Sequence, residues 1–187
     1  QHYLPGTNLL VTTFRTATGR LRLTDFMPVA AGDDCLEERE RQELYRCIEV
    51  TEGELPVRID FQPSFDYARA ETSLEMADNT ILARGGGQRL VLQIHGDRLQ
   101  VQDGRVATRL QLSAGEKVWL RLVWGDEQPP ALSADMAQET LEKTSAYWRA
   151  WLGRSETGQD HDFGPFAEMI VRSSLLLKLL DFAPSGA

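Results

Sequence analysis

The chain of 187 residues has only two cysteines and three histidines. Cys35 and Cys47 are too few for a disulfide scaffold or for a self-contained zinc site, and we expect both thiols to be unbridged. The apolar run at 175–177 is interrupted by Lys178, so no segment is long enough to span a bilayer. The sequence also lacks a Gly-x-Ser-x-Gly motif, which excludes a nucleophile elbow.

The sequence has fewer basic than acidic residues, with 20 Lys and Arg against 28 Asp and Glu, which gives a net charge of −8. This balance argues against a nucleic-acid binder and against a polybasic membrane anchor, which both need a basic face. A content of 42% hydrophobic and 26% charged residues is typical of globular proteins, and the length suits one domain or one domain with an appendage. No signal peptide is visible, which favours a cytoplasmic location, although a chain that starts at Gln1 looks truncated.

The segment from residue 8 to about residue 124 is predicted to be an antiparallel β-sandwich. Short stretches that alternate between apolar and polar residues are separated by turns rich in Gly and Asp, and no βαβ pattern is visible. The turns Thr18-Gly19 and Glu52-Gly53 are predicted to close hairpins, and Arg84 to Gly87 is predicted to be a hairpin turn. The expected strands are 8–14, 21–24, 44–50, 57–61, 80–83, 90–94, 99–101, 106–112 and 118–123.

Two C-terminal helices complete the predicted fold, which is mainly β. Ser133 is expected to cap a helix that runs to about Leu152, where Gly153 stops it. Apolar residues recur there every three or four positions, so the aromatic stripe Tyr147, Trp148 and Trp151 is interpreted as a packing face rather than as a sugar-stacking platform. The second helix, from about 164 to 180, is apolar around most of its circumference, so we expect protein on more than one side of it.

Several acidic or aromatic segments are candidates for chemistry. The acidic loop at 33–40 and the cluster at 160–162 match no metal-ligand spacing and are interpreted as solvated surface, so no metal or cofactor site is expected. The segment 63–67 carries two aromatic residues, expected to lean outward, that bracket an acid, which suits either the lip of a cleft or packing at a sheet edge. Asp25, at the end of a strand, is placed to cap loop amides.

A series of motifs occurs in a fixed order along nearly the whole chain. The motifs are Tyr3-Leu4-Pro5-Gly6-Thr7-Asn8, Thr24-Asp25-Phe26-Met27-Pro28, Pro63-Ser64-Phe65-Asp66-Tyr67, Thr144 with Tyr147-Trp148-Arg149-Ala150-Trp151, the run from Val171 to Leu180, and Pro184-Ser185-Gly186-Ala187. Each motif is weak by itself, but the ordered series resembles glycoside hydrolase family 15 of the bacterial glucoamylase and trehalase-like type.

The resemblance implies an N-terminal sandwich, a linker helix and a catalytic α/α barrel. It divides this chain into a sandwich at 1–128 without its opening strands, a linker at 129–163, and the start of a truncated barrel at 164–187. The barrel supplies the family's two catalytic glutamates, so no residue here is assigned a catalytic role and the chain alone is expected to be inactive.

The partners that the resemblance implies are the missing barrel of the same protein and its oligosaccharide substrate: malto-oligosaccharides, dextrin or trehalose, hydrolysed with inversion. The alternative is a non-catalytic carbohydrate-binding or structural sandwich module. If a loop of the sandwich reaches the rim of the active site, the candidate residues are Asp25, Phe26, Phe65, Asp66 and Tyr67.

Overall fold

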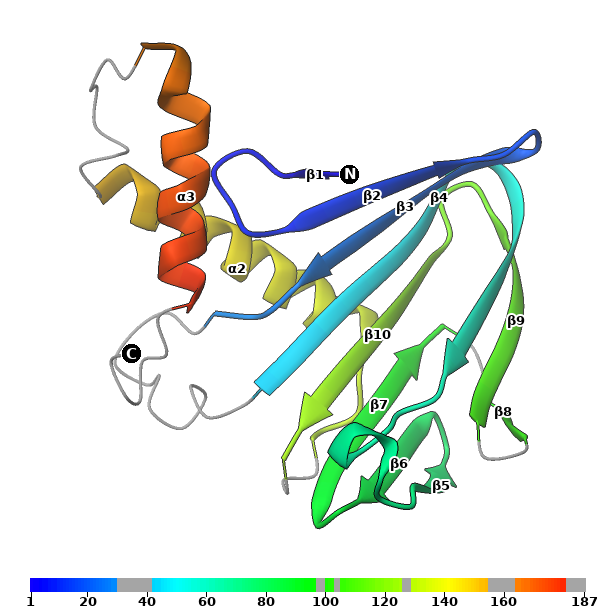
Figure 1. The fold of residues 1–187 in the computed structure, drawn as a ribbon. Coiled ribbons are helices and arrows are strands. Elements are labelled where there is room, and N and C mark those ends of the chain that lie inside the picture. Colours follow the sequence, from blue (N-terminus) through cyan, green and yellow to red (C-terminus); the bar gives the residue numbers. More distant parts are fainter. Residues whose placement is uncertain (30–41, 97–99, 103–104, 126–128, 155–163, 181–187) are drawn as a thin grey trace.

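The computed structural model describes residues 1–29, 42–96, 100–102, 105–125, 129–154 and 164–180. The described chain is mostly antiparallel sheet followed by two helices, as the alternating sequence pattern predicts (Figure 1). The strands are β1 (His2–Tyr3), β2 (Leu10–Arg15), β3 (Gly19–Phe26), β4 (Gln42–Phe61), β5 (Ser73–Ala77), β6 (Thr80–Gly85), β7 (Gln88–His95), β8 (Gln100–Gln102), β9 (Arg105–Ser113) and β10 (Lys117–Trp124). The helices are α2 (Ala134–Arg154) and α3 (Ala167–Leu180), with short 3-10 turns η1 (Asp66–Ala68) and η3 (Gly164–Phe166).

The long strand β4 belongs to both layers of the sheet. Its first half pairs with β3 and β10, in the order β1-β2-β3-β4-β10-β7-β6-β5, while residues 54–61 pair with β9, which in turn pairs with β8. The hairpin predicted at Glu52-Gly53 is therefore wrong, because the two halves of β4 do not pair with each other: the strand bends there and its second half runs in the other layer beside β9 (Figure 1). Gly53 permits the bend: its φ is +71°, and a Cβ at this position would lie 2.0 Å from the carbonyl oxygen of Thr18.

The main hydrophobic core fills the space between the two layers. Ile48 and Val50 from the first half of β4 belong to the same buried cluster as Leu55 from its second half and Leu110 from β9. Alternate residues of each strand point into this space because side chains on a strand face opposite sides in turn. The two layers therefore pack as a sandwich-like unit, as predicted.

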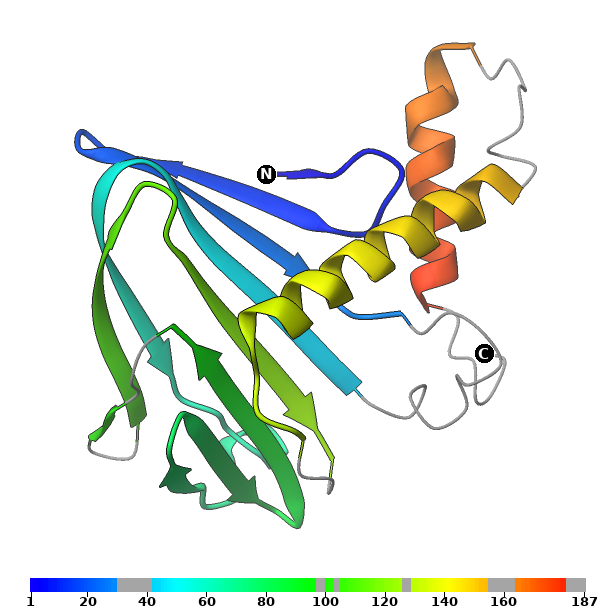
Figure 2. The ribbon, with the colours of Figure 1, turned by 180° about the vertical axis from the view of Figure 1, so that it is seen from behind.

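The opposite face of the large sheet is covered by α2, which crosses it diagonally (Figure 2). Trp148 from α2 lies in a second buried cluster with Trp119 and Cys47 of the sheet. Tyr147 and Trp151 flank Trp148, with ring centroids 5.4 and 6.5 Å away, which confirms the interpretation of the aromatic stripe as a packing face.

The start of α2 is also as predicted. The backbone N–H of Met136 donates a hydrogen bond of 3.2 Å to the Ser133 hydroxyl oxygen, which therefore caps the helix. The helix ends at Arg154, one residue after the glycine expected to stop it. Within the described part of the chain, neither helix is long and apolar enough to cross a membrane.

Candidate functional site

The first pair of candidate rim residues lies at the end of β3. Asp25 accepts hydrogen bonds of 2.7 and 2.9 Å from the guanidinium of Arg46, which lies opposite it on β4. The structure therefore shows an ion pair across two strands where the sequence suggested a cap on loop amides. Phe26 is buried and stacks on Tyr45, with ring centroids 5.3 Å apart.

The second group lies in the turn after β4, and its two aromatic rings differ in solvent exposure. Phe65 is buried against Trp124 of β10, with a centroid distance of 6.1 Å, so the expectation that it leans outward is wrong. Tyr67 is 93% exposed, and the guanidinium of Arg69 lies 5.6 Å from its ring centroid. Asp66 is exposed and forms an ion pair of 3.0 Å with Arg69.

The turn that carries Tyr67 has an unfavourable backbone. Asp66, Tyr67 and Ala68 have φ values of +47°, +56° and +64°, a left-handed conformation that costs a non-glycine residue roughly 1–2 kcal/mol. Arg69 closes the turn, because its backbone N–H and its Nε donate hydrogen bonds of 3.0 and 3.1 Å to the carbonyl oxygen of Asp66. Phe65 and Ala70 then form an isolated bridge.

The glycine turn between β6 and β7 makes room for this strained segment. A Cβ at Gly85 would lie 2.5 Å from the Phe65 ring and 2.8 Å from the carbonyl oxygen of Glu71, and a Cβ at Gly86 would lie 3.3 Å from Ala70. The predicted hairpin turn is confirmed, but sequence reasoning missed its role as a seat for the turn at 65–70 (the turn segment). Three successive glycines were the available indication of a close backbone approach.

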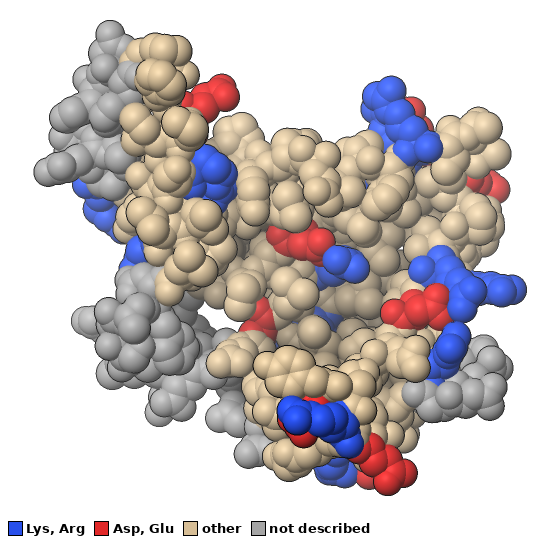
Figure 3. Space-filling view, in the orientation of Figure 1, with Lys and Arg blue, Asp and Glu red and all other residues tan. Residues whose placement is uncertain are grey.

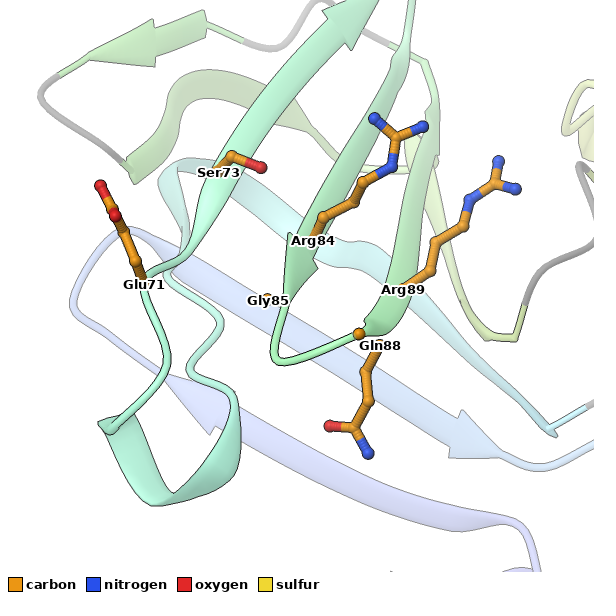
Figure 4. Close-up of a pocket in the computed structure, with 7 residues that line it drawn as sticks. Glu71, Ser73, Arg84, Gly85, Gln88 and Arg89 are labelled. Atoms are coloured by element: carbon orange, nitrogen blue, oxygen red, sulfur yellow. The ribbon is translucent and has the colours of Figure 1, made fainter.

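A hollow of about 520 Å³ lies beside this seat (Figure 4). Ser73, Arg84 and Arg89 occupy one row across β5, β6 and β7, and the two guanidinium groups point in the same direction. Nη1 of Arg84 lies 2.8 Å from a carboxylate oxygen of Glu75. The lining residues are Glu71, Ser73, Arg84, Gly85, Gly87, Gln88 and Arg89.

A separate polar cluster joins the two ends of the chain, and we call it the α3 clamp (Tyr3, Thr7, Asn8, Arg172 and Leu175). Arg172 donates a hydrogen bond of 2.8 Å to the carbonyl oxygen of Thr7 and another to the side-chain oxygen of Asn8. The Asn8 amide in turn donates a buried hydrogen bond of 2.9 Å to the carbonyl oxygen of Leu175. The Arg172 guanidinium lies 4.0 Å from the Tyr3 ring centroid, and its partial burial lowers the pKa of this arginine.

The clamp fixes one side of α3 and leaves the other side exposed and apolar. Phe166, Met169, Leu177 and Leu180 are 59%, 61%, 70% and 66% exposed, and we call them the α3 stripe. Met169, Leu177 and Leu180 are spaced by eight and three residues, which places them along one side of α3, and Phe166 precedes them in η3. In the space-filling view the surface over α3 is mostly free of charge, whereas acids and bases lie side by side on the sheet (Figure 3).

Groups for nucleophilic or metal chemistry are few in the part of the chain that the structure describes. Cys47 is a free, buried thiol whose pKa burial raises to about 11, so it is protonated at neutral pH and a poor nucleophile. Among the described residues, no group of three or more His, Cys, Asp or Glu side chains is placed to hold a metal ion. Cys35 and the acidic segments at 33–40 and 160–162 lie outside the described residues.

Sequence comparison shows that this chain is similar to trehalases. The chain is 27% identical to a trehalase of Mycolicibacterium smegmatis and 26% identical to a trehalase of Thermoplasma volcanium. Both alignments cover 100% of this chain but only 30% and 28% of the trehalase, so the chain spans less than a third of the length of these curated relatives. A solved structure titled a putative kojibiose phosphorylase from the human microbiome covers 87% of this chain at 12% identity, with a TM-score of 0.39. A family model described as "Trehalase-like, N-terminal" matches residues 1–148, and the chain therefore belongs to the trehalase-like N-terminal family.

Proposed function

We propose that this chain is the non-catalytic N-terminal part of a glycoside hydrolase of family 15 that hydrolyses α-glucosidic bonds in trehalose, malto-oligosaccharides or dextrin with inversion. In this proposal residues 1–128 form the sandwich, 129–163 the linker, and 164–187 the beginning of the catalytic barrel. The sandwich holds α3 at a fixed orientation, and the rest of the polypeptide packs on the exposed side of that helix.

The observation that carries the proposal is the α3 clamp together with the α3 stripe. A buried hydrogen bond from Asn8 and a partly buried one from Arg172 tie α3 to the segment between β1 and β2. Large apolar side chains are exposed along the other side of the helix, which suits packing of a further layer there. Trehalases more than three times as long as this chain offer a source for that layer within one polypeptide.

The ion pairs of three carboxylates in the sheet support the proposal that this part of the protein is non-catalytic. An inverting glycosidase needs two carboxyl groups about 6.5–9.5 Å apart that face each other across a sugar and a water molecule. Asp25, Glu49 and Glu75 instead each face an arginine of a neighbouring strand. These three carboxylates form ion pairs between neighbouring strands, so none of them faces a second carboxylate across a sugar-binding space.

Two measurements test this proposal. The purified chain is expected to release no glucose from trehalose, maltose or dextrin, whereas a commercial α-glucosidase assayed in parallel does. Release of glucose that a point mutation of this chain abolishes would contradict the non-catalytic assignment.

The reading frame beyond Ala187 supplies the second measurement. We expect it to continue into paired amphipathic helices that carry two glutamates. A frame that stops or continues into an unrelated domain would instead favour the alternative of an independent carbohydrate-binding or structural module.

A further inference from the structure

The two faces of the large sheet are covered differently. Cys47 and Trp119 pair across β4 and β10 and lie in one buried cluster with Trp148, so they point toward α2. Side chains alternate along a strand, so their neighbours Arg46 and Leu120 point to the opposite face. The second layer, formed by β8, β9 and the second half of β4, covers that opposite face, but it has fewer strands than the large sheet (Figure 1).

One row of paired residues shows how far this cover extends. Running from β1 to β7 across the large sheet, the row consists of Tyr3, Leu10, Asp25, Arg46, Leu120 and Ile94. Ile94 and Leu120 are buried in the main core under the second layer. Toward the other end of the row the cover is lost, because 47% of the Arg46 side chain and 42% of Tyr3 are exposed.

We call the uncovered part of this face the open face (Tyr3, Leu10, Asp25, Leu44 and Arg46). Leu44 lies two residues from Arg46 on β4, so it points in the same direction, and it is 38% exposed. The charges of Asp25 and Arg46 neutralise each other through hydrogen bonds of 2.7 and 2.9 Å. In the space-filling view the centre of this side of the molecule is hollowed and carries little charge (Figure 3). The open face therefore suits an apolar partner surface.

The α3 stripe lies on the same side of the molecule as the open face. Leu175 is buried in the cluster that includes Trp148, whereas Leu177 and Leu180 lie about 200° and 140° further around the helix. Accordingly, α3 lies in front of α2 in Figure 1 and behind it in Figure 2. Tyr3 joins the two surfaces, because the Arg172 guanidinium of α3 lies 4.0 Å from its ring centroid.

We infer that the open face and the α3 stripe form one docking surface for the part of the full-length polypeptide outside residues 1–187. The inference rests on the proposed function, and trehalases more than three times as long as this chain supply a polypeptide of sufficient length. A covalently linked partner is present at a high effective concentration, so it needs little affinity of its own. An apolar surface whose ion pair is already satisfied is also the kind that permanent interfaces bury.

The test is hydroxyl-radical footprinting, read by mass spectrometry, of this chain and of the protein encoded by the complete reading frame. The radicals oxidise side chains that are in contact with water. Oxidation of Tyr3, Leu10 and Leu44 is expected to be about fivefold slower in the complete protein, because the core of an interface excludes water. Met136, a partly buried residue of α2 on the other side of the sheet, is the control and should be oxidised equally in both proteins.

The variant Leu44→Gln gives an independent measurement. This chain should tolerate it, because Leu44 is partly exposed to water here. In the complete protein the same change places a polar group in an apolar interface, so the midpoint of thermal unfolding should fall by several degrees more than in this chain. Equal shifts in the two proteins would contradict the inference.

The outcomes separate this inference from the proposed function. Unchanged oxidation of the open face in a complete protein that protects the α3 stripe would overturn the inference and leave the proposed function intact. Equal protection of Met136 would show that the cover is not specific to this side. Protection that rises with the concentration of this chain alone would assign the surface to a second copy and overturn the inference. A reading frame that ends at Ala187 would overturn both.

Discussion

At the scale of single residues, Gly85 is where the hairpin between β6 and β7 approaches the turn segment most closely. A Cβ there would overlap the Phe65 ring at 2.5 Å and the Glu71 carbonyl oxygen at 2.8 Å. We predict that Gly85→Ala lowers the free energy of unfolding by about 2 kcal/mol, because neither obstacle can move without disturbing the turn. Urea unfolding monitored by tryptophan fluorescence measures the change.

Gly153 provides the control for this prediction. It lies near the end of α2, and a Cβ at this glycine would meet nothing within 4 Å. Gly153→Ala should therefore leave stability unchanged or raise it by up to about 1 kcal/mol, because alanine is the better helix former. Equal losses in the two variants would mean that close packing at Gly85 does not set the cost.

Single residues also show where sequence reasoning reaches its limit. The sequence identified the segment 63–67 as unusual, but it gave no means to separate Phe65 from Tyr67. Their exposure depends on three positive φ values and on Trp124, a residue far along the chain. Neither is encoded in local periodicity, so the sequence predicts the same outward tendency for both rings.

At the scale of elements, the α3 clamp decides whether α3 stays on the sheet. We predict that Asn8→Ala loosens α3, since it removes the donor to the carbonyl oxygen of Leu175 and the acceptor for Arg172. Amide hydrogen exchange of residues 167–180, measured by mass spectrometry, should accelerate about 5- to 30-fold, corresponding to a loss of about 1–2 kcal/mol of local stability. Exchange in β4 and β10 should not change.

The control for the clamp is Ser173→Ala, which alters an exposed residue of the same helix. Its exchange is expected to match that of the wild type. Uniform acceleration across the whole chain in Asn8→Ala would show instead that the clamp supports global stability rather than the attachment of one helix.

The elements themselves were largely predictable, and the exceptions have physical reasons. β9 is predictable because its buried residues alternate and the period of two is visible in the sequence. β7 and β10 are each buried over four consecutive residues, and they are predictable as short apolar runs bounded by turn residues. β5 is not predicted by the sequence pattern, because this edge strand is exposed at nearly every position. The pattern predicts two strands in place of β4 because Glu52-Gly53 is typical of a turn, whereas pairing with β9 and the close approach of Gly53 to Thr18 make it a bend.

At the scale of the whole molecule, the sandwich and the two helices follow from local patterns, but the meeting of the two chain ends does not. The motifs around Asn8 and Arg172 are separated by almost the entire chain, and only the fold brings them into contact. That contact orients α3 so that its apolar side faces away from the sheet. The sequence indicated that this helix needs protein on more than one side, and the structure identifies which side is still exposed.

The exposed side of α3 leads to a prediction about the purified chain. The four large apolar side chains of the α3 stripe are exposed, and we expect this patch to bind hydrophobic dyes and to promote self-association. The triple variant Met169→Gln, Leu177→Gln and Leu180→Gln should bind the dye ANS about half as strongly or less, and should sediment as a monomer at concentrations where the wild type associates.

The matched control replaces three apolar residues of the sandwich that are also about half exposed. Phe14, Met27 and Met76 are 51%, 49% and 49% exposed but lie in β2, just after β3 and in β5, so no single element carries them as a stripe. The corresponding triple glutamine variant should behave like the wild type in both measurements. If it lowers dye binding and association as much as the α3 variant does, exposure in general is responsible. The α3 stripe would then lose its role as the surface prepared for the rest of the polypeptide.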